Sequence, residues 1–97
     1  RGALVLDIEN GTEEKVGLAL AIVTDEWYET PVVELAPGPN KAVAFDLRAG
    51  NFKAASTEWK HAAAVKQLDK PKFVSLLLYT KQAGVFTLGN VRLPKAP

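Results

Sequence analysis

Four aromatic side chains with a polar tip are the residues of this 97-residue chain whose chemistry points most directly to a ligand. They are Trp27, Tyr28, Trp59 and Tyr79. Flat rings of this type stack on the apolar faces of sugar rings, while neighbouring polar groups bind the hydroxyls. The first two rings stand beside Asp25, Glu26 and Glu29, so this segment has the mixture of residues that a sugar site uses.

Each of these rings also has a structural interpretation. Trp27 and Tyr28 are placed where side chains cap the open end of a β-sandwich, and Trp59 is placed to anchor a long connection to the core. Tyr79 ends an apolar strand, on a face expected to be concave and lined also by Ser75, Asp46 and Arg92, with the small residues Gly17, Ala19, Ala21, Ala42 and Ala44. Small residues leave room for a ligand groove, and equally for a neighbouring domain or a covering loop.

The composition argues against an enzyme and against a metal centre. The chain has no cysteine and a single histidine, His61, so thiolate and histidine metal clusters are excluded. Neither Ser56 nor Ser75 stands in a nucleophile elbow. Adjacent acids such as Asp25 and Glu26 are usually solvated loop residues rather than a glycosidase pair. We therefore expect no catalytic residues, no metal ligands and no enzymatic activity of the domain itself.

Charge and hydropathy exclude two further classes of partner. Twelve Lys and Arg residues against eleven Asp and Glu residues give a net charge of +1, without the clustered basic face that nucleic-acid binding needs. No apolar stretch reaches the 18 residues of a membrane span. We expect neither a nucleic-acid partner nor a membrane partner.

Apolar alternation between turn signals predicts an all-β protein. Strands are expected at 4–9, 16–24, 32–35, 43–47, 73–79 and 85–93, with Val74, Leu76 and Leu78 pointing into the core. Residues 25–31 are expected to form a loop, and the proline-containing segment 37–40 is expected to lie outside any sheet. In the long connection 52–67, Ala62–Ala64 favours one or two helical turns, capped by Ser56 or Thr57.

This pattern predicts an antiparallel β-sandwich of jelly-roll type, with residues 1–97 as a single domain. The chain begins at Arg1 rather than at Met, so we expect it to be excised from a larger multidomain protein. Because a jelly roll has eight strands and fewer are predicted here, we expect a flanking strand to have been trimmed or to come from elsewhere.

The order of these motifs resembles the galactose-binding-like jelly-roll domains, particularly the carbohydrate-binding modules attached to bacterial glycoside hydrolases. The resemblance spans about residues 3–93 and is carried by the Trp27-Tyr28-Glu29 loop, the Pro37-Gly38-Pro39-Asn40 turn followed by Phe45-Asp46-Leu47, the connection with Trp59, the strand ending at Tyr79 and the segment 84–93. It implies a noncatalytic module that binds a polysaccharide or oligosaccharide through Trp27, Tyr28, Trp59 and Tyr79. It also implies a linked catalytic domain and an extracytoplasmic or secreted location.

The resemblance departs at the end of the chain. Members of this family often hold a structural calcium with an Asp that precedes an Asn, whereas Gly89 precedes Asn90 here. We therefore expect no cofactor, although Asp7, Glu9 and backbone carbonyls offer an alternative calcium set. The competing hypothesis for function is a structural accessory β-sandwich domain that packs on a catalytic domain and binds no sugar.

Overall fold

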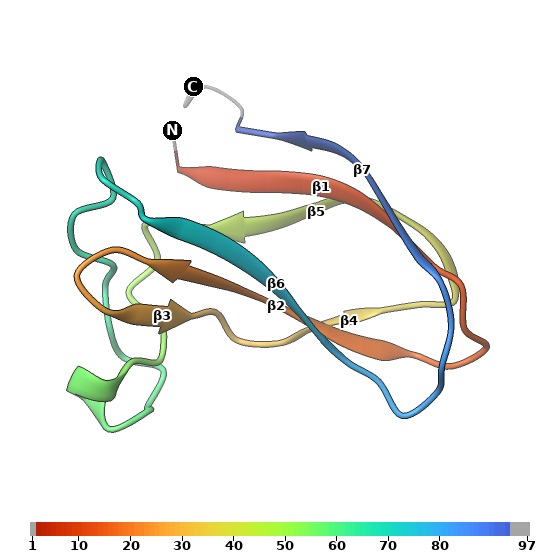
Figure 1. The fold of residues 1–97 in the computed structure, drawn as a ribbon, viewed down its shortest axis with the longest axis horizontal. Coiled ribbons are helices and arrows are strands. Elements are labelled where there is room, and N and C mark those ends of the chain that lie inside the picture. The colour runs from red at the N-terminus through yellow and green to blue at the C-terminus, as the bar shows by residue number, and fades with distance from the viewer. Residues whose placement is uncertain (1, 94–97) are drawn as a thin grey trace.

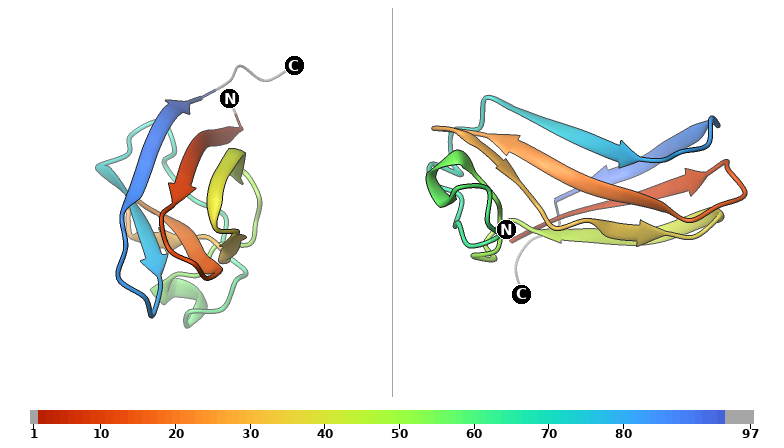
Figure 2. Two further views of the ribbon diagram at one scale, coloured as in Figure 1. Left: turned by 90° about the vertical axis from the view of Figure 1, so that its right-hand side faces the viewer. Right: turned by 90° about the horizontal axis from the view of Figure 1, so that it is seen from below.

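The computed structural model describes residues 2–93, which form two antiparallel β-sheets (Figure 1). The strands are β1 (Ala3–Asn10), β2 (Val16–Val23), β3 (Trp27–Glu29), β4 (Val33–Leu35), β5 (Gly38–Asp46), β6 (Phe73–Tyr79) and β7 (Phe86–Arg92). The first sheet has the order β5-β1-β7. In the second sheet β2 is central, with β3 and β4 along one edge and β6 along the other. Figure 2 shows the two layers from two further directions.

The main core lies between the sheets, where the alternating apolar residues of β1 and β2 meet. Leu6 and Ile8 of β1, Leu18 and Leu20 of β2 and Phe45 of β5 are all buried in one cluster. Burying each of these side chains stabilises the fold by roughly 1.5–3 kcal/mol relative to exposure. The all-β class and the two antiparallel sheets predicted from the sequence are therefore confirmed. The expected range 1–97 includes residues 1 and 94–97, which lie outside the described residues.

A second core cluster lies under the long connection between β5 and β6. Tyr28, Phe52, Ala54 and Ala63 are buried together with Ile22 of β2. An isolated bridge between Glu29 and Lys53 attaches this connection to the edge of β3, and a second bridge joins Phe52 to Ala63 within the connection. The helical turns expected here are reduced to one 3-10 turn, Ala55–Thr57, because Ala63 pairs with Phe52 instead of continuing a helix.

Two other local expectations were wrong. Residues 27–29 form strand β3 rather than a loop, because they pair with residues 21–23 of β2. Pro39 lies within β5, opposite Glu9 of β1. Proline is tolerated there because β5 is an edge strand, so its missing N–H does not have to face another strand.

The face expected around Tyr79 is divided between the two sheets. Gly17, Ala19 and Ala21 do share a sheet with Tyr79 and Ser75. The remaining residues expected on that face, Ala42, Ala44, Asp46 and Arg92, belong to β5 and β7 of the other sheet.

None of the helices in the described part of the chain is long and apolar enough to cross a membrane.

Candidate functional site

The outer face of the second sheet gathers three aromatic rings around a row of small residues. On β2, the residues that alternate with the buried leucines are Gly17, Ala19, Ala21 and Val23. Cross-strand partners share a face of a sheet, so the register shows which side chains join them. We call this surface the aromatic face and define it by these four β2 residues together with Trp27, Glu29, Lys53, Phe73, Ser75, Leu77 and Tyr79.

The side chain of Tyr79 crosses the central strand. Tyr79 pairs with Gly17, while Glu29 pairs with Ala21 on the opposite edge of β2. The Tyr79 hydroxyl nevertheless donates to Oε2 of Glu29 at 3.0 Å. Neighbouring strands are about 4.8 Å apart, so the phenol must extend over β2 at the level of Ala19 to reach that oxygen. Ala19 and Ala21 are indeed completely buried although they lie on the outer face.

One side of the Tyr79 ring therefore lies against the sheet. The residue stays 49% exposed. This combination of an anchored hydroxyl and an open surface is what a stacking platform for a ligand requires.

Gly17 makes this arrangement possible at the base of the ring. A Cβ atom at this position would lie 2.6 Å from Cγ1 of Val32 and 3.4 Å from Cβ of Tyr79. The first distance is shorter than real Cβ contacts, so any larger residue would displace Val32 or Tyr79. The small residue is thus required by the packing of the outer face and not by the backbone conformation.

Glu29 is the polar centre of the aromatic face. Its Oε1 accepts a hydrogen bond from Nε1 of Trp27 at 3.2 Å, and its Oε2 lies 3.1 Å from Nζ of Lys53 and accepts from the Tyr79 hydroxyl. The residue is buried. Burial alone would raise the pKa of Glu29, but the contacts with Lys53, Trp27 and Tyr79 outweigh it and lower the pKa below its ordinary value. Burial and the Glu29 carboxylate together raise the pKa of Tyr79. The carboxylate thus holds two rings in place.

Trp27 and Phe73 form the second aromatic part of this face. Both pair with Val23, from opposite edges of β2. Their rings meet edge to face, with centroids 6.2 Å apart and an interplanar angle of 69°. Trp27 is half-buried and Phe73 is exposed. Trp27 and Tyr79 donate to the two oxygens of the same Glu29 carboxylate, so the two aromatic parts adjoin each other at this residue.

Tyr28 has no ring face available to a ligand. It points to the opposite side of β3 from Trp27, is buried against Phe52 in an edge-to-face contact, and donates its hydroxyl to Oδ1 of Asp25 at 2.8 Å. Burial, together with the hydrogen bond to Asp25, raises the pKa of Tyr28 to about 12. The structure thus gives Tyr28 the structural role that was its alternative interpretation.

Trp59 is exposed in the long connection. Its backbone N–H donates to the carbonyl oxygen of Ala54 at 2.9 Å, and its backbone has a left-handed φ of 63°. Its ring takes part in neither of the ring contacts found in the described residues. Of the four residues proposed from the sequence, the structure therefore brings together Trp27 and Tyr79. Sequence analysis did not propose Phe73 or Lys53 as site residues. For Phe73 a signal was present, because alternation along the strand places it on the same face as Tyr79.

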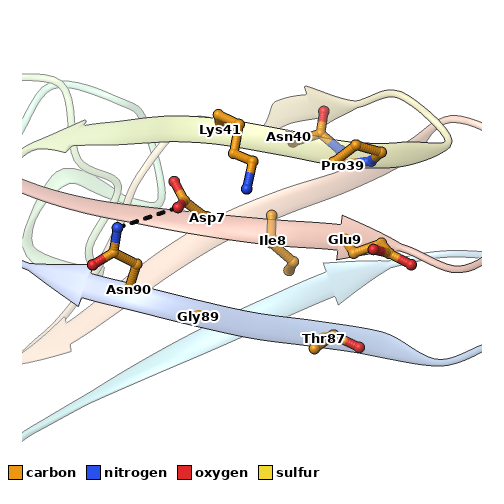
Figure 3. Close-up of a pocket in the computed structure, with 9 residues that line it drawn as sticks. All are labelled: Asp7, Ile8, Glu9, Pro39, Asn40, Lys41, Thr87, Gly89 and Asn90. Carbon is orange, nitrogen blue, oxygen red and sulfur yellow. Dashed lines mark hydrogen bonds between the residues drawn. The ribbon is translucent and has the colours of Figure 1, made fainter.

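A shallow groove of about 210 Å³ lies on the outer face of the other sheet (Figure 3). At its centre is Asp7, whose Oδ1 accepts from the backbone N–H of Ala42 at 2.8 Å and whose Oδ2 accepts from Nδ2 of Asn90 at 3.4 Å. Next to Asp7, the pairing register of β1 shifts against both of its neighbouring strands, β5 and β7. Ala42 of β5 and Asn90 of β7 have left-handed φ angles of 53° and 54°. These bonds, the one from Ala42 foremost, lower the pKa of Asp7.

The carboxylate of Asp7 thus stabilises two β-bulges of its own sheet. Asp7 and Glu9, the side chains offered for calcium, both line this groove, but no group of three or more acidic or histidine side chains suited to a metal occurs among residues 2–93. No aromatic ring lines the groove. The aromatic face is therefore the better candidate for a binding site.

Comparison of the chain with protein families, with curated proteins and with solved structures gives no significant match.

Proposed function

We propose that this protein is a noncatalytic carbohydrate-binding domain that holds a polysaccharide or oligosaccharide chain on its aromatic face. The observation that supports this most is the ring of Tyr79, which lies across small residues, is held by Glu29 and stays half exposed. Trp27 and Phe73 supply further ring surface on the same face, where Trp27 is held by the same Glu29 carboxylate. Lys53 and Ser75 lie beside the rings and supply polar groups for hydroxyls.

Binding without catalysis fits the electrostatics of this face. Glycoside hydrolysis needs a proton donor and a second carboxylate at a suitable distance from it. The buried carboxylate of the aromatic face, Glu29, has a lowered pKa and is engaged by three neighbouring side chains. It therefore positions rings and is poorly suited to donate a proton. The benefit to a linked catalytic domain would be a raised local concentration of its polysaccharide.

The proposed fold is a jelly roll, in keeping with the resemblance to galactose-binding-like domains. Four connections support it, because the chain passes from one sheet to the other between β1 and β2, between β4 and β5, between β5 and β6 and between β6 and β7. A secreted or extracytoplasmic location and a linked glycoside hydrolase belong to the same proposal.

The second candidate function is a structural accessory domain that packs on a catalytic domain. The row of small residues no longer favours it, because Ala19 and Ala21 are covered by side chains of the domain itself. What favours it is the exposed apolar surface along β6 and β7, where Val74, Leu88 and Val91 are all open to solvent.

Affinity electrophoresis through gels that contain plant, algal or microbial polysaccharides tests the proposal. We expect retardation in at least one gel and its loss in a Tyr79→Ala variant, since a ring contact of about 1.4 kcal/mol corresponds to about tenfold in affinity. Trp59→Ala is the matched control, because it removes an exposed aromatic ring outside the aromatic face.

Three results are informative about this site. Loss of retardation in Tyr79→Ala but not in Trp59→Ala supports the aromatic face. Loss only in Trp59→Ala would move the site to the long connection and contradict the proposal. Free migration of the folded protein in every gel would favour the accessory domain instead.

A further inference from the structure

One side of the β-sandwich is left open, between strands β6 and β7. These two strands are the edges of different sheets and lie on the same side of the molecule (Figure 2). Within residues 2–93, β6 pairs only with β2, and β7 pairs only with β1. Each strand therefore presents a row of backbone N–H and C=O groups without a partner strand, which is the template for adding another strand.

Apolar side chains that point inward are exposed along this side. Val74 pairs with the core residue Ile22, and Leu78 pairs with the core residue Leu18. Paired residues share a face, so both side chains point toward the space between the sheets. Yet Val74 is 48% exposed and Leu78 is 38% exposed, although Ile22 and Leu18 are buried.

The facing strand shows the same feature. Leu88 of β7 pairs with the buried Ile8 and is itself 48% exposed. We call the two unpaired edges and the inward side chains of Val74, Leu78 and Leu88 the open side. The exposure of inward-pointing side chains on both edges shows that residues 2–93 leave the space between β6 and β7 uncovered.

The edge of β6 is the better template of the two. Its pairing with β2 is regular over seven residues, and no charged residue occurs between Phe73 and Tyr79. Edge strands are normally protected by charges, prolines or bulges, and β6 has none of these. In β7 the register is interrupted by a bulge near Asn90, which has a left-handed φ of 54°.

Lysines flank both ends of β6, whereas Arg92 of β7 is already paired with Asp7 at 3.5 Å. Residues 70–93 contain Lys70, Lys72, Lys81 and Arg92, and no Asp or Glu. Lys72 immediately precedes β6, and Lys81 follows it by two residues. An occupant with acidic residues at its two ends is therefore complementary in charge. A second copy of the same edge would bring like charges together.

We propose that the open side binds an extended segment of another polypeptide, which adds as a strand to β6. Side chains of that segment at alternate positions are aliphatic and fill the space against Val74, Leu78 and Leu88. Its ends are acidic and lie near Lys72 and Lys81. This inference is independent of the sugar site, because the aromatic face uses the outward side chains of β6 and the open side uses the inward ones.

Titration with a synthetic peptide tests this inference. The probe is the blocked peptide EVTVSLTVE, and binding is followed by the backbone amide signals of the isotope-labelled 97-residue protein. We expect the largest shifts in β6 and β7, and slower hydrogen exchange of those β6 amides that are free in the absence of peptide. The peptide KVTVSLTVK, with the end charges reversed, is expected to bind at least about tenfold more weakly.

Matched protein variants separate the open side from general apolar attraction. Leu88→Glu places an acid on the open side and is expected to weaken binding at least about tenfold. Val32→Glu changes a similarly exposed apolar residue directly before β4, on the opposite edge of β2 from β6, and is expected to leave the affinity within about twofold.

Three results would overturn the proposal. The first is that the amide signals of β6 and β7 do not shift at millimolar peptide. The second is that the two folded variants lose binding equally. The third is that the protein already forms a dimer through β6. The last result would make a second copy the occupant. Amide spectra of each variant show beforehand that it is folded.

Discussion

Replacing Glu29 by Gln is predicted to destabilise the domain and to loosen the aromatic face. Glutamine keeps the shape of the side chain and imitates a protonated glutamate. It has a single oxygen, whereas Nε1 of Trp27 and the hydroxyl of Tyr79 both donate to the carboxylate, and Nζ of Lys53 lies 3.1 Å from it. In the variant at least one donor loses its acceptor, and the amide N–H2 group faces another donor.

The size of the effect follows from these contacts. Hydrogen bonds to charged groups contribute about 1.5–3 kcal/mol each, but water replaces part of the loss because Lys53 and Tyr79 are partly exposed. We therefore expect Glu29→Gln to lower the free energy of unfolding by about 2 kcal/mol at pH 7. For a domain of this size that corresponds to a fall in Tm of about 8–16 °C.

The pH dependence gives a second, independent readout. The pKa of Glu29 is lowered from its ordinary value of 4.5 in the folded protein. The stabilisation is then complete above about pH 4.5 and is lost as the pH falls through the lowered pKa. The difference between the wild-type protein and the variant should therefore shrink as the pH falls below 4.5, because both side chains become neutral.

Urea unfolding monitored by tryptophan fluorescence at a series of pH values measures this difference. Glu34→Gln is the control, since Glu34 forms an exposed pair with Lys15 at 3.6 Å. Its removal should cost no more than about 1 kcal/mol. Equal stability of Glu29→Gln and the wild-type protein at pH 7 would refute the role of Glu29. A difference that stays constant down to pH 2.5 would refute its electrostatic origin.

Two further predictions concern neighbouring residues. In an ultraviolet titration of the phenols, Tyr28 should ionise near pH 12, and a Tyr28→Phe variant should lose that transition; ionisation of Tyr28 near pH 10 in the folded protein would contradict its burial beside Asp25. Gly17→Val should crowd Val32 and displace Tyr79, lowering stability by about 1–3 kcal/mol in thermal unfolding, whereas an unchanged Tm would show that the outer face has room at this position.

The long strands could be predicted from the sequence because their apolar residues alternate with a period of two. The buried residues Leu6 and Ile8, and Leu18 and Leu20, show this period directly. Short strands could not be predicted in the same way. Residues 27–29 carry no alternation long enough to recognise, and they form β3 only because Val23 and its neighbours offer a free edge.

The candidate site was predictable only in part. Trp27 and Tyr28 look alike in the sequence, but adjacent residues of a strand point to opposite faces. Once 27–29 becomes a strand, one ring lies on the outer face and the other in the core. Trp59 is exposed and lies in a turn with left-handed backbone angles. Its ring contacts none of the other aromatic rings among the described residues.

The amino-acid pattern was enough to predict which residues alternate, where the chain turns, and that the fold is an all-β domain without cysteine and with a net charge of +1. The hydrogen bond across β2 between Tyr79 and Glu29, fifty positions apart, follows only from how the strands pair. Strand pairing likewise leaves Val74 and Leu78 exposed, although their alternation predicts both as core residues. The physical reason is that alternation fixes the face of a strand on which a side chain lies, whereas only the pairing of strands fixes its neighbours.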